Sequence, residues 1–246
     1  MDFLKANFKS LIITFSVIIT GYILGKSYLS KGKADPTISV TGLGETTFNS
    51  DLIVWRADFS RKNSTLKDAY SELNADLRSV KDYFKKKGIN TKDVIFEAAA
   101  IQKEYYNEYD DNGNVRSSIF SGYKLTQSMK IQSDNVDLIE KTSREVSELI
   151  DAGIELNSNA PEYYYTKLAE LKLSMIEQAT KDAFNRAQKI AENGGGSLGN
   201  LKSADMGVFQ ITAENSAEDF EWGGSFNTSS KRKTANITMR LKYEID

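Results

Sequence analysis

The sequence contains no cysteine and no histidine, and only two of its 246 residues are proline. Without cysteine the chain can form no disulfide, no thiolate metal site and no thiol nucleophile. Without histidine it lacks the usual general base near neutral pH and the commonest metal ligand. These absences exclude Ser-His-Asp and Cys-His catalysis, so any enzyme chemistry would have to use carboxylates, Lys, Tyr, Ser or an oxygen-ligated metal.

An excess of positive charge is also missing. Lys and Arg number 32 against 34 Asp and Glu, which gives a formal net charge of −2. The first 34 residues carry five Lys and one Asp, so the rest of the chain carries 27 basic and 33 acidic residues. Because phosphate contacts need clustered Lys and Arg, we expect this mildly acidic body to bind no nucleic acid.

Near the N-terminus, 16 uncharged and mostly apolar residues lie between Lys9 and Lys26. As a helix they span about 24 Å. Their length and flanking charges are typical of a signal segment, and no small-residue cleavage site follows cleanly. We therefore predict that residues 1–34 are an uncleaved signal anchor and polar linker, with a removed signal peptide or a buried core helix as alternatives. The predicted membrane-anchoring residues are Leu11, Ile12, Ile13, Phe15, Val17, Ile18, Ile19, Ile23 and Leu24.

The rest of the chain, residues 35–246, is predicted to be one α+β domain. A period of two among apolar residues, or a short apolar run, predicts strands near 37–45, 51–62, 93–106, 115–132, 197–212 and 234–245. Residues 153–167 are predicted to be extended as well, with a break at Pro161. A spacing of three or four predicts helices near 66–87, 135–151 and 168–193. Since hairpins alternate with helices, we expect a largely antiparallel sheet with helices packed on one face, preceded by the N-terminal hydrophobic helix.

Residues 193–200, NGGGSLGN, contain the spacing G-x-G-x-x-G of dinucleotide-binding turns. In such turns the glycines leave a strand and open a helix, whose N-terminus meets the pyrophosphate. Here they follow the longest predicted helix of the body and lead into a strand, so the helix dipole presents its negative end. We therefore predict a helix C-cap and a tight turn, with no cofactor.

The acidic residues form no recognisable metal or catalytic motif. Counting from Asp110, an EF-hand needs Gly at its sixth position and Glu at its twelfth, where Val115 and Ser121 stand. Asn112-Gly113 instead predicts a hairpin tip. We therefore predict no metal and no catalytic residue, although the abundance of acids leaves a carboxylate-based hydrolase as an alternative. The acids of this region are Glu97, Glu104, Glu108 and Asp110.

Tyrosines gather at 105–109 and at 163–165. Because three consecutive residues of an extended segment cannot all face one core, Tyr163, Tyr164 and Tyr165 are predicted to form part of a homo-oligomer interface at a sheet edge. Alternatively, they pack within one subunit under the polar loop 213–233. In that loop, a candidate mobile binding loop, the embedded aromatic residues are Phe220, Trp222 and Phe226.

Five segments of the chain together carry a family resemblance. In chain order they are ISVTGLGE (38–45), KKKGINTKDV, SGYKLTQSMKIQ, ATKDAFNRAQKIAENGGGSLGNL and ANITMRLKYEI (235–245). Together they resemble the SIMPL-domain family of mostly exported bacterial proteins, some of them called periplasmic immunogenic or oxidative-stress-associated proteins. The resemblance covers nearly all of 37–246, although Gly194–Gly196 and Tyr163–Tyr165 depart from the usual pattern. It implies an α+β fold, a cell-envelope location and a tendency to form homo-oligomers, and it brings no catalytic residues.

From the sequence we expect a non-enzymatic, self-assembling scaffold or binding module. It would be anchored in the inner membrane with its body facing the periplasm or the exterior, or else secreted after signal cleavage. The alternatives are a histidine-free hydrolase of the cell envelope and a receptor module that binds a small ligand under the 213–233 loop.

Overall fold

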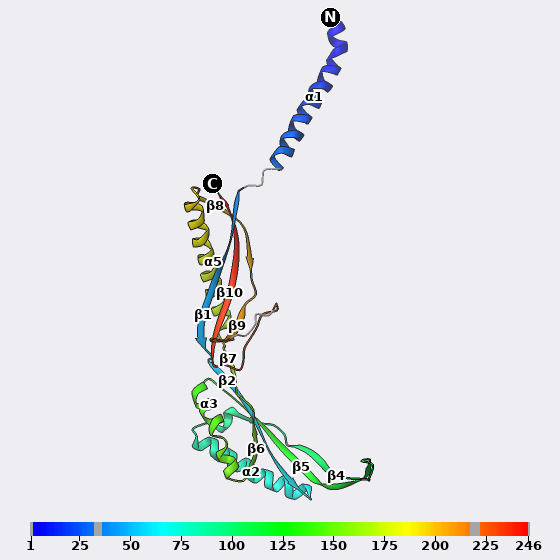
Figure 1. Ribbon diagram of the computed structural model, residues 1–246, viewed down its shortest axis with the longest axis vertical. Coiled ribbons are helices and arrows are strands. Elements are labelled where there is room, and N and C mark those ends of the chain that lie inside the picture. Colours follow the sequence, from blue (N-terminus) through cyan, green and yellow to red (C-terminus); the bar gives the residue numbers. More distant parts are fainter. Residues whose placement is uncertain (1, 32–35, 217–221, 246) are drawn as a thin grey trace. The chain divides into compact units, whose positions relative to one another are not determined.

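The computed structural model describes residues 2–31, 36–216 and 222–245; within the first helix, the side chains of 2–7, 9, 11 and 29–31 are not among those described (Figure 1). The helices are α1 (Asp2–Lys31), α2 (Leu66–Lys86), α3 (Val136–Glu145), α4 (Glu148–Asp151) and α5 (Leu168–Asn193), with a 3₁₀ turn η1 (Thr91–Asp93). The strands are β1 (Thr37–Asn49), β2 (Leu52–Asn63), β3 (Val94–Phe96), β4 (Ala100–Tyr109), β5 (Val115–Ser133), β6 (Glu155–Ser158), β7 (Glu162–Tyr164), β8 (Leu198–Met206), β9 (Gln210–Ala213) and β10 (Arg232–Ile245).

These elements confirm the predicted α+β class. The strands are divided between two sheets, one with the order β1-β10-β8 and β9 beside β10, the other with the order β3-β5-β2-β6. In the second sheet β4 also pairs with β5, and β7 with β2. Both sheets are largely antiparallel, as predicted.

By its internal contacts the chain divides into two compact units. Unit 1 comprises Met1–Leu43, Thr180–Met206 and Met239–Asp246, and unit 2 comprises Gly44–Ala179 and Gly207–Thr238. The division falls within β1, α5 and β10, so each unit contains a part of all three elements.

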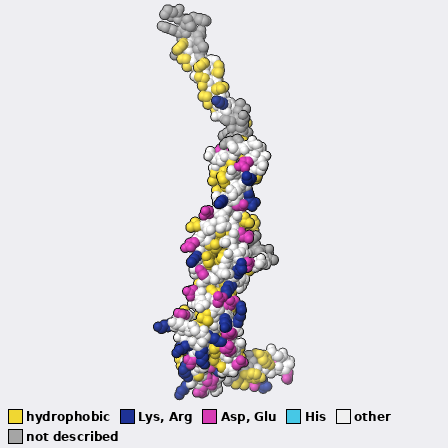
Figure 2. All heavy atoms as spheres, turned by 90° about the vertical axis from the view of Figure 1, so that its left-hand side faces the viewer, with side chains coloured by type: hydrophobic (Ala, Val, Ile, Leu, Met, Phe, Trp, Pro, Cys, Tyr) yellow, Lys and Arg dark blue, Asp and Glu magenta, His cyan; other side chains and the backbone are white. Residues whose placement is uncertain are grey.

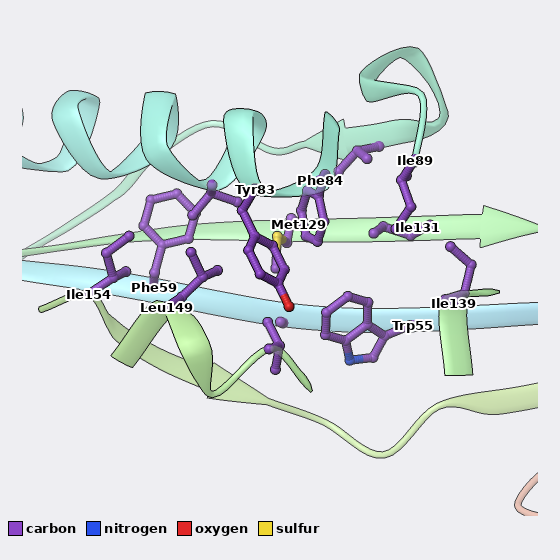
Figure 3. Packing of buried hydrophobic residues seen from close by; sticks show 14 of the residues in the cluster. Trp55, Phe59, Tyr83, Phe84, Ile89, Met129, Ile131, Ile139, Leu149 and Ile154 are labelled. Atoms are coloured by element: carbon purple, nitrogen blue, oxygen red, sulfur yellow. The ribbon is translucent and has the colours of Figure 1, made fainter. Parts of the chain in front are cut away.

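The main hydrophobic core of unit 2 lies between α2 and the β2–β5 pair (Figure 3). Thr65 caps α2, because its hydroxyl accepts a hydrogen bond from the backbone N–H of Asp68. The apolar residues of α2 at a helical spacing are buried against the sheet, where Phe84 meets Trp55 edge to face at 6.0 Å. The predicted amphipathic helix therefore holds the long strand β2 in place.

Helix α5 packs closely on the first sheet because its inner face carries small residues. In unit 2, Gly44 of β1 lies so near the carbonyl oxygen of Met175 that a Cβ at this position would clash with the α5 backbone. In unit 1, Ala183 and Ala187 are fully buried, and Asp182 accepts a hydrogen bond from the backbone N–H of Leu43 at 2.9 Å. The small residues on this face of α5 thus permit the close approach of the helix to the sheet.

The glycine run after α5 ends the helix, as predicted. Gly195 has a φ of +83°, a conformation that favours glycine. The N–H of Gly196 donates to the carbonyl of Ala191 at 3.0 Å, and the N–H of Gly195 donates to that of Glu192 at 3.2 Å. These are the two hydrogen bonds of a Schellman C-cap.

The N-terminal apolar run forms helix α1, whose described hydrophobic side chains are exposed and follow the helix in Figure 2. Among the residues that the structure describes, no helix has the combination of length and hydrophobicity of a membrane span. The prediction of a transmembrane helix is therefore not supported. The exposed anchor residues are Ile12, Ile13, Phe15, Val17, Ile18, Ile19, Ile23 and Leu24, while the side chain of Leu11 lies outside the described residues.

Candidate interaction surfaces

The three consecutive tyrosines make their contacts inside unit 2. Tyr163 is only 7% exposed and belongs to the main core. Its backbone N–H donates to the carbonyl of Thr228 at 2.7 Å, while β7 pairs with β2. The edge that the sequence predicts as unpaired is therefore occupied at this residue. The ring of Tyr165 lies 4.6 Å from Phe48, so the arrangement resembles the alternative of packing within one subunit.

Tyr164 belongs to a small charged cluster on β2 and β7. Its hydroxyl donates to the carboxylate of Glu162 at 3.0 Å, and Arg56 donates to the same oxygen at 2.8 Å. The hydrogen bond from Arg56 is the largest of the effects that hold the pKa of Glu162 below its ordinary value. The hydrogen bond to Glu162 in turn raises the pKa of Tyr164. These contacts fasten β7 to β2.

The loop 213–233 contributes to an open cleft of about 350 Å³ in unit 2. Of its three predicted aromatic residues, Phe226 lines the cleft. Trp222 is 99% exposed and directly precedes the lining residue Gly223. Phe220 lies outside the described residues. The phenyl ring of Phe226 also lies 6.4 Å from that of Tyr164. Among the described residues the lining is Leu168, Lys172, Val208, Phe209, Ile211, Gly223, Gly224, Ser225 and Phe226.

A second surface is the outer part of the β4–β5 hairpin, residues 100–122, which we call the arm (Figure 1). It extends past the last β2 pairing, Asn63 with Tyr123, and its tip is the predicted Asn112-Gly113 turn. In this stretch both strands are mostly exposed. The large exposed hydrophobic residues of the arm are Ile101, Tyr105, Tyr106, Tyr109, Val115, Ile119 and Phe120.

Both faces of the arm carry exposed apolar side chains. On one face Tyr105 pairs with Phe120, and their rings meet edge to face at 5.8 Å. On the other, Tyr106 pairs with Ile119. Within the described part of the chain, no further strand pairs with the outer edge of β4 or with residues 115–122 of β5. Two-stranded ribbons are marginally stable in water, and open strand edges are templates for pairing with another chain.

The acidic residues considered for catalysis have separate structural contacts. Glu104 pairs with Lys62 at 2.9 Å, and Glu108 accepts a hydrogen bond from Ser117 at 2.8 Å. Asp110 accepts the backbone N–H groups of Asn112 and Asn114, which close the hairpin turn and lower the pKa of Asp110. Across residues 2–31, 36–216 and 222–245, no group of three or more acidic side chains is placed to hold a metal ion.

The fold and these surfaces define an α+β protein with an exposed apolar hairpin and an open cleft. The sequence of this chain matches the model of the SIMPL family, described as a protein of unknown function (DUF541), over residues 38–241. The chain therefore belongs to the SIMPL family, as the sequence resemblance predicts. No curated protein matches it significantly.

Proposed function

We propose that this protein is a self-assembling binding module of the cell envelope and that the arm joins it to a second copy of the same chain. The observation that carries the proposal is the exposed apolar surface on both faces of the arm. A hairpin of this kind gains stability when another surface covers its side chains. A second copy fits because it offers the same open strand edges and the same tyrosines, and tyrosine is enriched at protein interfaces.

Assembly is tested by changing one face of the arm without weakening the hairpin itself. In the double variant Tyr106→Glu/Ile119→Lys the two partners keep a favourable cross-strand contact but lose their apolar surface. Sedimentation velocity of the purified full chain should show a multimer for the parent and a smaller species for the double variant.

The matched control is Tyr70→Glu, which replaces a tyrosine that is 54% exposed in α2 of the same unit. This variant should sediment like the parent, and circular dichroism should show that all three chains are folded. A parent that is monomeric at micromolar concentrations, or a double variant of unchanged size, would refute assembly through the arm.

Envelope location and membrane association are part of the same proposal. The support for export is the SIMPL membership together with the positively flanked apolar segment at the N-terminus. The support for association is that the described apolar side chains of α1 are exposed, as on a helix that meets a partner or a lipid surface.

A further inference from the structure

The open cleft of unit 2 combines an apolar wall with a single positive charge. Leu168, Val208, Ile211 and Phe226 supply aliphatic and aromatic surface, and Lys172 is the only charged residue among the described residues of the lining. The volume of the cleft, about 350 Å³, lies in the range of small-molecule sites. Such sites are mostly apolar, with a few polar groups that fix the orientation of the ligand.

The charge of Lys172 is not neutralised by a described side chain. Its ammonium group lies 5.2 Å from the centre of the Phe209 ring, and it forms no ion pair with an acid in the described part of the chain. By contrast, Lys87 and Lys231 in the same unit each contact two carboxylates. Leu168 is the first residue of α5, so the positive end of the helix dipole lies at the cleft as well.

The opposite wall of the cleft is held in a fixed conformation. The N–H of Ser225 donates to the side-chain oxygen of buried Gln210 at 2.7 Å, and the N–H of Ile211 donates to the carbonyl of Ser225 at 2.8 Å. Gly224 has a φ of +92°, and a Cβ there would lie 2.8 Å from the carbonyl oxygen of Phe209. The wall is therefore preorganised, which lowers the cost of ordering it around a ligand.

We propose that this cleft binds a small amphiphilic carboxylate. The apolar body of the ligand would lie against Val208 and Phe226, and its carboxylate would accept hydrogen bonds from the ammonium group of Lys172. A charge-assisted hydrogen bond in a largely apolar cleft selects an anion over a neutral molecule of the same shape. The inference is independent of assembly through the arm, because the arm and the cleft share no residue.

Octanoate and octan-1-ol are suitable probes, because they share an alkyl chain and differ in charge. Calorimetric titration of the purified full chain should show saturable binding of octanoate and much weaker binding of octan-1-ol. Fluorescence gives a second readout, because the two tryptophans differ sharply: Trp55 is 1% exposed and Trp222 is 99% exposed beside the cleft residue Gly223. Octanoate should shift the emission of the exposed tryptophan, and this shift should disappear in Trp222→Phe.

The discriminating variant is Lys172→Met, which keeps an apolar side chain and removes the charge. It should weaken octanoate binding by about tenfold or more, the factor expected for one charged hydrogen bond. Lys172→Arg should retain binding. Lys167→Met, an exposed lysine that does not line the cleft, should leave the affinity unchanged. Val208→Trp should block the cleft from a half-exposed position and abolish binding with the fold intact.

Three results would overturn the proposal. They are an absence of saturable octanoate binding to the folded parent, equal affinity for octanoate and octan-1-ol, and equal affinity of the parent and Lys172→Met. Because the oligomeric state is measured separately, a monomeric parent that binds octanoate would contradict the proposed assembly and leave this inference standing.

Discussion

At the scale of single residues, many charged side chains of unit 2 join one element to another. Arg61 of β2 forms a double hydrogen bond with Asp76 of α2 and also donates to the carbonyl of Gly153 at 2.8 Å. Lys87, just after α2, contacts Glu145 of α3 and Glu148 of α4, and the pKa of Lys87 is raised by these hydrogen bonds. Arg61 and Lys87 thus form ion pairs with described carboxylates, whereas Lys172 does not.

The partly buried ion pair between Arg61 and Asp76 should contribute strongly to stability. Asp76 is 6% exposed, so Asp76→Ala leaves a partly buried guanidinium without its partner. We expect the free energy of unfolding to fall by about 2–3 kcal/mol, measured by urea denaturation. Lys62→Met, which removes the exposed ion pair with Glu104 one position along β2, is the control and should change stability little. Equal effects of the two variants would contradict this assignment.

Glu162 should make the fold sensitive to acid. Its pKa is held below the ordinary 4.5 by the hydrogen bonds from Arg56 and Tyr164. The carboxylate therefore stabilises the folded chain fully above that value, and the contribution is lost as the pH falls through the lowered pKa. Thermal unfolding between about pH 6 and about pH 3 should show a flatter decline for Glu162→Gln than for the parent. Glu177→Gln, on the exposed part of α5, should follow the parent curve.

At the scale of elements, local signals predicted helix ends well. The predicted C-cap after α5 is the Schellman turn of the structure, and it depends only on residues within a few positions of the helix end. The predicted range 168–193 coincides with α5. Such ends could be predicted because capping needs no knowledge of the rest of the fold.

The Schellman turn allows a test that separates a structural role from a nucleotide-binding role. Gly195→Ala places a Cβ in a left-handed conformation and should lower the free energy of unfolding by about 1 kcal/mol. Gly195→Asn should be less harmful, since asparagine tolerates that conformation better. Thermal denaturation measures both. Saturable binding of NAD or ATP by the folded parent, abolished in Gly195→Ala, would instead require a nucleotide role.

The pairing of strands that are distant in the chain could not be predicted from the sequence. The predicted strand 93–106 is split into β3 and β4, and the predicted helix 135–151 into α3 and α4. One apolar pattern cannot show where a strand changes its neighbour, nor that β1 pairs with β10 from the far end of the chain. The candidate surfaces were predicted only in part for the same reason. Tyr105 and Tyr106 form a cluster that is visible in the sequence, but their exposure depends on β2 ending at Asn63.

Lys172 had no signal in the sequence that would distinguish it from other helix lysines. Lys172 lines the same cleft as Phe209 and Phe226 because a parallel bridge between Ile211 and Phe226 brings the 213–233 loop back beside β9. Only the folded backbone places these residues around one cleft. The loop itself was predicted as a binding loop from its embedded aromatic residues, and that prediction still awaits a ligand.

At the scale of the whole molecule, the exposed apolar side chains of α1 bear on where the protein resides. We expect alkaline carbonate extraction to leave the full chain in the membrane pellet and to release a chain that begins at Asp35, because the apolar side chains of α1 are then absent. Immunoblotting of the two fractions measures the outcome. A native mature chain that is soluble and begins between residues 26 and 36 would remove the anchor and still indicate export.

The interleaving of the two units has a consequence for synthesis. Unit 1 is assembled from three separate stretches of the chain, and unit 2 from two. β10 supplies strand residues to both units and is the neighbour of β1, so the first sheet is incomplete until residues 232–245 have been translated. Neither unit can therefore finish folding while the ribosome is still adding those residues. The residues of the main core all lie between Ile53 and Tyr163, so that core can pack first, and completion of both units falls at the end of elongation.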